Sequence, residues 1–125
     1  MDSFTELVLD QLRGVPALTW RRMFGGYGFY SGGLFFAVVW DDRLFLKTGE
    51  AERAAYQARG MGPFTYEGGA LTSLWEVPAE VLEDADELTA WATRAVAAAR
   101  AAKLRAARKP RPPRPRGERP PRDRG

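Results

Sequence analysis

Pairs of turn-forming residues cut most of this chain into short segments, and their spacing limits the folds that it can adopt. Glycine pairs suit two-residue hairpin turns because both central positions of a type I′ turn need positive φ, and aspartate tolerates the same conformation. Gly-Gly or Asp-Asp pairs occur at 25–26, 32–33 and 41–42, between the strand-like runs LTWRRMF, YGFYS, LFFAVVW and RLFLK. A further pair at 68–69 separates PFTYE from LTSLWEV. The pattern predicts an antiparallel meander over 18–47 and a second hairpin over about 63–77.

Helical signals occur at three places. Ser3 and Glu6 have the spacing of a capping box, which opens a helix over about 3–13. Thr48 is the expected N-cap, and Gly60 the stop, of a short helix over 48–60. Asp84 is the expected N-cap of a long helix that runs to about residue 107. That last helix has one apolar stripe, made of Leu88, Trp91, Ala92, Ala95, Val96 and Ala99.

The expected fold is a two-layer α+β domain. Its antiparallel meander sheet has about five or six strands and is flanked by an N-terminal helix, a short middle helix and a long C-terminal helix. The run at 34–40 is apolar throughout, which predicts a central strand that is covered on both faces or shielded by helices. A chain of 125 residues, 45% of them hydrophobic, is long enough for one such core.

The chain contains neither cysteine nor histidine. Disulfides, thiol nucleophiles, Ser-His-Asp and Cys-His catalysis and the usual zinc sites are therefore excluded. We expect no enzyme, no catalytic residue, no cofactor and no metal site. No apolar run approaches the roughly 20 residues that cross a bilayer. The opening MDSFTELVLD also lacks the basic start of a secretory signal, so we expect a cytoplasmic protein with no membrane contact.

Charge is divided unevenly along the chain. Residues 1–102 hold 9 Lys/Arg and 14 Asp/Glu, whereas residues 103–125 hold 10 and 2. We expect residues 1–103 to form the folded domain, and residues 104–125 to form a basic Arg/Pro-rich tail that starts as the end of a helix and continues as a disordered segment with polyproline II bias.

The tail carries the strongest functional signal, because arginine forks match phosphate geometry. The candidate contacts with nucleic acid or another polyanion are Arg105, Arg108, Lys109, Arg111, Arg114, Arg116, Arg119, Arg122 and Arg124. Such contacts would be non-specific, since phosphates carry no sequence information. The structural alternative is a solubilising tail, or a tail held against the acidic domain.

The glycine-rich run Met23-Phe24-Gly25-Gly26-Tyr27-Gly28 could be a ligand loop or a backbone device. No Gly-Lys-Ser/Thr follows it, and Ser31 stands where a dinucleotide fingerprint needs glycine. Matches to the KH clamp and to the RRM strand motif fail on their flanking elements. We therefore expect a structural role in which Gly25, Gly26 or Gly28 adopts positive φ.

Three further groupings have both a structural and a functional interpretation. Arg21-Arg22 could join Lys47 in a basic patch, although neighbours on a strand point to opposite faces and solvated edge charges are the simpler interpretation. Asp41-Asp42 could hold a metal with Glu67 or Glu76, but a polar turn explains the aspartates. A base-stacking platform or a sheet core could be built from Tyr27, Phe29, Tyr30, Phe35, Phe36, Trp40 and Phe45.

The chain resembles the N-terminal domain of the TfoX/Sxy family. The resemblance rests on RRMFGGYGFYSGGLFFAVVWDDRLFLKT (21–48), GMGPFTYEGGALTSLWEVPAEVLED (60–84) and ELTAWATRAVAAA (87–99). It implies a two-layer α+β domain without catalytic residues, and a role in regulating competence genes beside a cyclic-AMP-responsive activator. Full-length members carry a second, helical C-terminal domain. Here the Arg/Pro-rich tail takes its place, so a stand-alone N-terminal domain is expected.

Together these observations predict a non-enzymatic regulatory or protein-interaction domain with a polyanion-binding tail. The alternative is a non-specific nucleic-acid-binding accessory protein in which the tail is primary. An enzyme would need a closed pocket that gathers Lys47, a tyrosine and a carboxylate with shifted pKa values. A protein partner is expected, and a homodimer through a free sheet edge or an aromatic patch stays open.

Overall fold

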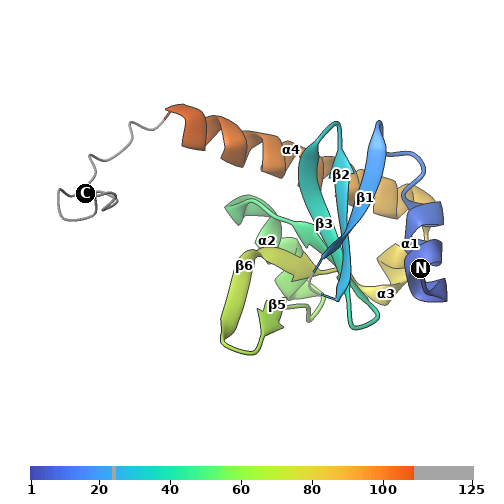
Figure 1. The fold of residues 1–125 in the computed structure, drawn as a ribbon. Coiled ribbons are helices and arrows are strands. Elements are labelled where there is room, and N and C mark those ends of the chain that lie inside the picture. The colour runs from blue at the N-terminus through green and yellow to red at the C-terminus, as the bar shows by residue number, and fades with distance from the viewer. Residues whose placement is uncertain (24, 109–125) are drawn as a thin grey trace, which may run out of the picture.

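The computed structural model describes residues 1–23 and 25–108 (Figure 1). The predicted turn pairs lie at or next to the turns between its antiparallel strands. Four helices accompany a six-stranded, open, antiparallel sheet in the described residues, so the predicted α+β class is confirmed. The elements, in chain order, are α1 (Ser3–Gln11), β1 (Leu18–Met23), β2 (Gly26–Ser31), β3 (Leu34–Trp40), β4 (Arg43–Lys47), α2 (Glu50–Ala58), β5 (Pro63–Tyr66), β6 (Gly69–Glu76), α3 (Ala79–Leu82) and α4 (Ala85–Arg108).

Two of the four turn pairs form the predicted two-residue turns. Gly32 and Gly33 have φ of 54° and 83°, and Asp41 and Asp42 have φ of 54° and 56°, which are the positive values that a type I′ turn needs. The other two pairs are displaced by one residue. Gly26 pairs with Met23 and belongs to β2, and Gly69 likewise begins β6.

The sheet follows a meander only as far as β4. Its order is β1-β2-β3-β4-β6-β5, so the second hairpin adds to β4 through its later strand. Because β4 and β5 both pair antiparallel with β6, the strand β5 runs parallel to β4. Placing β6 beside β4 keeps every neighbouring pair antiparallel, the slightly more stable arrangement per residue.

The helix ends differ from the sequence-based expectation at two of three N-termini. Asp2 rather than Ser3 caps α1, because the Thr5 backbone N–H donates to Asp2 Oδ1 at 2.7 Å. Gly49 rather than Thr48 caps α2. The Thr48 hydroxyl donates instead to the Ser73 carbonyl at 3.2 Å, and so joins β4 to β6.

The predicted cap and stripe of α4 are confirmed. The Glu87 backbone N–H donates to Asp84 Oδ1 at 3.0 Å, and all six residues of the stripe are buried. The short helix α3 is not predicted by the sequence pattern, in which Pro78 only ends the second hairpin. In the structure Pro78 is the N-cap residue of this helix.

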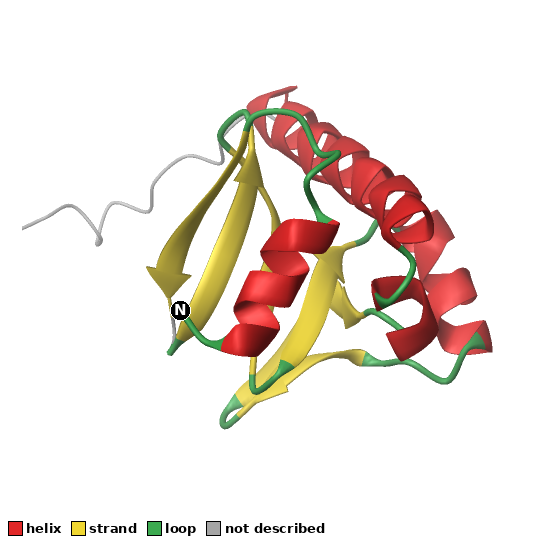
Figure 2. Cartoon of the chain, turned by 90° about the vertical axis from the view of Figure 1, so that its right-hand side faces the viewer, coloured by secondary structure: helices red, strands yellow, loops and turns green. Residues whose placement is uncertain are grey.

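The two faces of the sheet have different coverings. The main core lies between the sheet and the helices, and α4 packs along β3 and β4, as Figure 2 shows from the side. A second, smaller cluster lies on the opposite face and contains Val38, Phe45, Phe64 and Leu74, with Met23, Phe35 and Trp40 packed against it. All of these residues come from strands, and we call this the helix-free face. No helix among the described residues is long and apolar enough to span a membrane.

Candidate functional site

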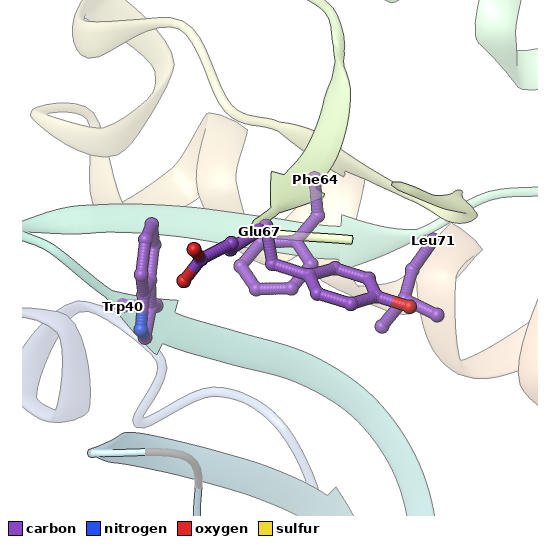
Figure 3. A pocket seen from close by; sticks show the side chains of 5 residues that line it. Trp40, Phe64, Glu67 and Leu71 are labelled. Atoms are coloured by element: carbon purple, nitrogen blue, oxygen red, sulfur yellow. The ribbon is translucent and has the colours of Figure 1, made fainter. Parts of the chain in front are cut away.

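The helix-free face is hollowed next to the β5–β6 hairpin. A groove of about 410 Å³, lined by Trp40, Phe64, Tyr66, Glu67 and Leu71, opens there (Figure 3). We call it the aromatic groove. Its volume lies in the range of ordinary ligand pockets, roughly 300–1,000 Å³. Figure 3 shows the carboxylate of Glu67 turned toward the Trp40 ring.

Phe64 holds the groove together. Its ring centroid lies 5.4 Å from that of Trp40, 4.9 Å from that of Phe45 and 6.1 Å from that of Tyr66. The first two contacts are edge-to-face, and each such pair is worth about 0.5–1.5 kcal/mol beyond burial. Only 4% of Phe64 is exposed, whereas Tyr66 is 46% exposed. The groove therefore has a rigid floor and an accessible wall.

The β5–β6 register explains why these side chains meet. Phe64 and Tyr66 are two residues apart on β5, so both point to the same face. Leu71 is the direct partner of Phe64, and Gly69 is the partner of Tyr66. A Cβ at Gly69 would lie 3.2 Å from the Tyr66 hydroxyl oxygen, so the missing side chain leaves room for the Tyr66 ring. The two-residue turn places Glu67 beside the rings.

A second hollow of about 260 Å³ continues along the same face. It shares Phe64 and Leu71 with the aromatic groove, and its other lining residues are Met23, Tyr30, Phe35, Val38 and Leu74. Among the described residues that line either hollow, Glu67 is the one with a charged side chain. The helix-free face thus offers an extended apolar trough with one carboxylate at its rim.

The glycine-rich motif builds part of this face. Gly25 has φ of 77°, which confirms the prediction of positive φ within the motif. A Cβ at Gly26 would lie 2.0 Å from the Val39 carbonyl oxygen, and one at Gly28 would lie 2.5 Å from Met23 Cε. Gly28 therefore lets the Met23 side chain lie across β2. Tyr27 is buried in the main core, and Phe24 lies outside the described residues.

A second candidate surface is the C-terminal part of α4. The last buried residue of this helix is Ala99, and beyond it the helix projects from the domain (Figure 1). We define its basic end as Arg100, Lys103, Arg105 and Arg108, all of which are exposed. Of the residues predicted from sequence to contact a polyanion, Arg105 and Arg108 lie here. The others lie outside the described residues: Lys109, Arg111, Arg114, Arg116, Arg119, Arg122 and Arg124.

One hollow gathers the groups that enzyme chemistry would need. Lys47, Glu52 and Tyr56 line it, together with Trp91, Arg94 and other residues. Its volume is only about 30 Å³, which is the space taken by about one water molecule. Burial raises the pKa of the Tyr56 hydroxyl above its usual value, and nearby Arg94 only partly offsets this. Tyr56 is therefore held neutral, whereas a tyrosine that acts as a base needs a lowered pKa.

The aromatic residues that could build either a base-stacking platform or a sheet core are divided between the two faces. Tyr27, Phe29 and Phe36 belong to the main core, while Phe35, Trp40 and Phe45 belong to the helix-free face. The split follows from the alternation of side chains along a strand, which turns the neighbours Phe35 and Phe36 of β3 to opposite faces. Tyr30 lines the second hollow.

The other groupings do not assemble. Arg21 and Arg22 sit on the edge strand β1 and approach the Tyr30 and Tyr27 rings at 5.8 and 5.9 Å, and β2 and β3 separate them from Lys47 on β4. Asp41 and Asp42 form a hairpin turn. Within residues 1–23 and 25–108, no group of three or more acidic side chains is placed to hold a metal ion.

Sequence reasoning missed the residues of the β5–β6 hairpin that complete the groove. The spacing of Phe64 and Tyr66 two residues apart was a usable signal for a shared face. The residue pattern of a short segment does not predict that this hairpin lies beside Trp40, because that position depends on the pairing of β6 with β4.

Comparison with known proteins adds one match. The family model described as the TfoX N-terminal domain matches residues 10–99, which is most of the described chain. The match contains all six strands, α2, α3 and most of α4. It also contains every residue of the aromatic groove. A search of the curated proteins finds no match.

Proposed function

The chain belongs to the TfoX N-terminal domain family, and on that premise we propose that it is a non-enzymatic regulatory domain that binds polyanions through the basic end of α4 and the Arg/Pro-rich residues after it. The family is associated with competence regulation, which supports a regulatory role. The finer proposal concerns how the domain reaches its target. We place this action in the cytoplasm, where proteins rarely contain disulfides, and this chain has no cysteine with which to form one.

The observation that carries the proposal is the charge of the projecting helix. After Glu87, the remaining 21 residues of α4 contain no acidic residue, and the basic end adds four positive charges in its last nine residues. Two of these cations, Arg105 and Arg108, lie in the last turn of α4, where they interact favourably with the helix dipole. The projection leaves these side chains free of packing against the sheet.

Residues 109–125 extend the same positive charge, with 7 Lys/Arg against 2 Asp/Glu. Helix and tail together can therefore present a long series of cations to a phosphate backbone. Each neutralised phosphate on duplex DNA contributes about −0.9 to the slope of log affinity against log salt. Engagement of all four cations of the basic end would account for about −3.6 of that slope.

The interior of the domain supports a role without catalysis. The aromatic groove and the second hollow are lined by apolar and aromatic side chains with one carboxylate, Glu67. The hollow that gathers Lys47, Glu52 and Tyr56 has space for about one water molecule. These features suit binding rather than acid–base chemistry.

The test compares two full-length variants that lose the same charge at different places. One carries Arg100→Gln, Lys103→Gln, Arg105→Gln and Arg108→Gln, and glutamine is nearly as good a helix former as the residues it replaces. The control replaces four exposed arginines elsewhere: Arg13→Gln, Arg21→Gln, Arg22→Gln and Arg43→Gln. Fluorescence anisotropy measures binding to labelled duplex DNA and to single-stranded RNA between about 50 and 200 mM KCl. Circular dichroism checks the helix content of both variants.

We expect the α4 variant to bind more weakly, with a shallower salt dependence, and the control to bind like the unmodified protein. Equal loss in both variants, or a salt-insensitive affinity, would contradict the proposal. The alternative function is a non-specific nucleic-acid-binding accessory protein in which the Arg/Pro-rich tail is primary. Because its contacts would also be to phosphates, heparin should displace DNA or RNA in either role, and the two roles differ in whether residues 1–103 without the tail keep any function. The charge of the projecting helix supports both roles.

A further inference from the structure

The aromatic groove carries two of the large hydrophobic side chains that the domain exposes. In the described residues, six large hydrophobic side chains are more than a third exposed, and two of them, Tyr66 at 46% and Leu71 at 38%, line this groove. Because the second hollow shares Phe64 and Leu71, the two form one trough. Concave, mostly apolar hollows with a few polar groups are the usual form of binding sites.

The lining of the trough suits a proline-rich segment that also carries arginine. Polyproline II segments dock into grooves walled by aromatic rings, and their fixed backbone loses little entropy on binding. Trp40 and Tyr66 provide such walls, and the buried Phe64 ring forms the floor, since it contacts both of the others. Glu67 at the rim provides a carboxylate for a guanidinium, which can bind it through two parallel hydrogen bonds.

The chain itself contains a segment of this chemistry. Residues 109–125 read KPRPPRPRGERPPRDRG, in which six prolines are interspersed with six arginines and one lysine. Charge favours their approach to the domain, because residues 1–108 hold 12 Lys/Arg against 14 Asp/Glu, whereas residues 109–125 hold 7 against 2.

The segment is also long enough to reach the groove. It starts after Arg108, at the end of α4, and in Figure 1 this end and the β5–β6 hairpin lie toward the same side of the molecule. Seventeen residues at about 3.1 Å each span roughly 53 Å. A domain of about 108 residues has a radius of gyration near 13 Å, or a diameter of about 35 Å, and the nine residues of α4 after Ala99 add about 14 Å, which together stay below the span of the segment. The segment can therefore pass around the sheet edge to the helix-free face.

We propose that the aromatic groove binds residues 109–125 of the same chain, with prolines against Trp40, Phe64 and Tyr66 and an arginine on Glu67. This docking needs no polyanion, so it stands or falls independently of the proposed function. Where both hold, a docked segment withholds its arginines from phosphates. Binding of a polyanion and docking in the groove then compete for the same residues.

The test uses the full chain and exploits its lack of cysteine. A single Gly117→Cys substitution allows a nitroxide label to be attached within the segment, and paramagnetic broadening of amide signals then reports where the label lies. We expect strong broadening of the amides of residues 64–71 and of the Trp40 indole N–H. Raising the salt to about 1 M shortens the Debye length to about 3 Å and reduces the broadening.

Two charge-reversal variants provide the matched comparison. Glu67→Arg places a cation at the groove and reduces the docking equilibrium constant by about two- to fivefold, the range of an exposed ion pair. Glu83→Arg makes the same charge change on the exposed C-cap residue of α3, and it leaves the broadening unchanged. The undisturbed amide spectrum away from each substitution shows that both variants are folded.

Three results would overturn the proposal. Amides of 64–71 that stay sharp would show that the segment does not visit the groove. Broadening spread over all acidic surfaces and indifferent to Glu67→Arg would show charge attraction alone. The third result is docking between two copies of the chain. It is tested in a mixture of isotope-labelled protein without nitroxide and unlabelled protein that carries the nitroxide. Broadening in that mixture as strong as in the singly prepared labelled, nitroxide-carrying protein would assign the groove to the segment of a second copy.

Discussion

Gly26→Ala provides the sharpest test of what the glycine-rich motif does. A Cβ at this position would lie 2.0 Å from the Val39 carbonyl oxygen and 3.3 Å from Trp40 Cα. Ordinary carbon–oxygen contacts lie at about 3.3 Å or more, so the backbones of β2 and β3 would have to separate by roughly 1.3 Å. Both atoms belong to the backbone of the central strand β3, so they cannot move aside by a side-chain rotation.

The cost has two parts. Separation of β2 from β3 weakens at least two ladder hydrogen bonds, each worth about 1 kcal/mol. Disturbed packing around the added methyl group costs about 1–3 kcal/mol more. The expected loss is therefore about 3–5 kcal/mol, a large share of the roughly 5–15 kcal/mol that usually stabilises a domain. In urea unfolding followed by tryptophan fluorescence, a slope near 2 kcal/mol per molar moves the midpoint down by about 2 M.

Gly25→Ala is the control, because this neighbour is glycine for a different reason. Gly25 has φ of 77°, and no atom lies within 4 Å of the place that a Cβ would take, so only the left-handed strain of about 1–2 kcal/mol applies. Gly25→Asn should cost less than Gly25→Ala, since asparagine tolerates this conformation. Equal midpoints for Gly26→Ala and Gly25→Ala would refute the assignment of a close backbone approach to Gly26.

Three further predictions concern the core and the helices. Asp84→Ala should lower the free energy of unfolding by about 1 kcal/mol, because α4 loses the cap on the Glu87 N–H, and Asp84→Ser should restore most of it in the same urea assay. The free energy of unfolding should fall by up to about 1.4 kcal/mol per pH unit above about pH 10, since the unfolded tyrosine ionises there while burial keeps Tyr56 protonated in the native state. Urea titrations at several alkaline pH values should show a smaller fall in Tyr56→Phe, and an unchanged slope would contradict this cause. Phe64→Ala should lower the free energy of unfolding by about 3–5 kcal/mol, because it removes the side chain that contacts Trp40, Phe45 and Tyr66. Leu71→Ala, at a 38% exposed site, should lower it much less. Similar thermal midpoints for the two variants would show that Phe64 is not the centre of the groove.

Local chemistry was enough to predict most elements of this fold. Gly32-Gly33 and Asp41-Asp42 form the predicted turns because positive φ is a preference of the residues themselves. The stripe from Leu88 to Ala99 is buried as expected, since helical spacing brings those residues to one side. The motif that suggested the family also lies within the matched residues.

The sequence-based predictions are wrong where the role of a residue depends on its contact with a distant part of the chain. Gly26 was expected in a turn, but it lies in β2, where the carbonyl of Val39 needs the space of its missing side chain. Thr48 was expected to cap α2, but its hydroxyl bonds to Ser73 on β6. In both cases the residue type fits two roles, and only the neighbouring strand selects between them.

Two of the four turn pairs, three of the four helices, the α+β class and the concentration of positive charge after residue 100 follow from the amino-acid order, because each depends on residues close together in the chain. The placement of β6 rather than β5 beside β4 depends instead on the assembled sheet, and so does the meeting of Phe64 and Tyr66 with Trp40. Strand order is set by which pairing keeps neighbours antiparallel and buries apolar side chains on both faces. The free energy of that arrangement depends on all six strands together, so no short stretch of sequence predicts the aromatic groove.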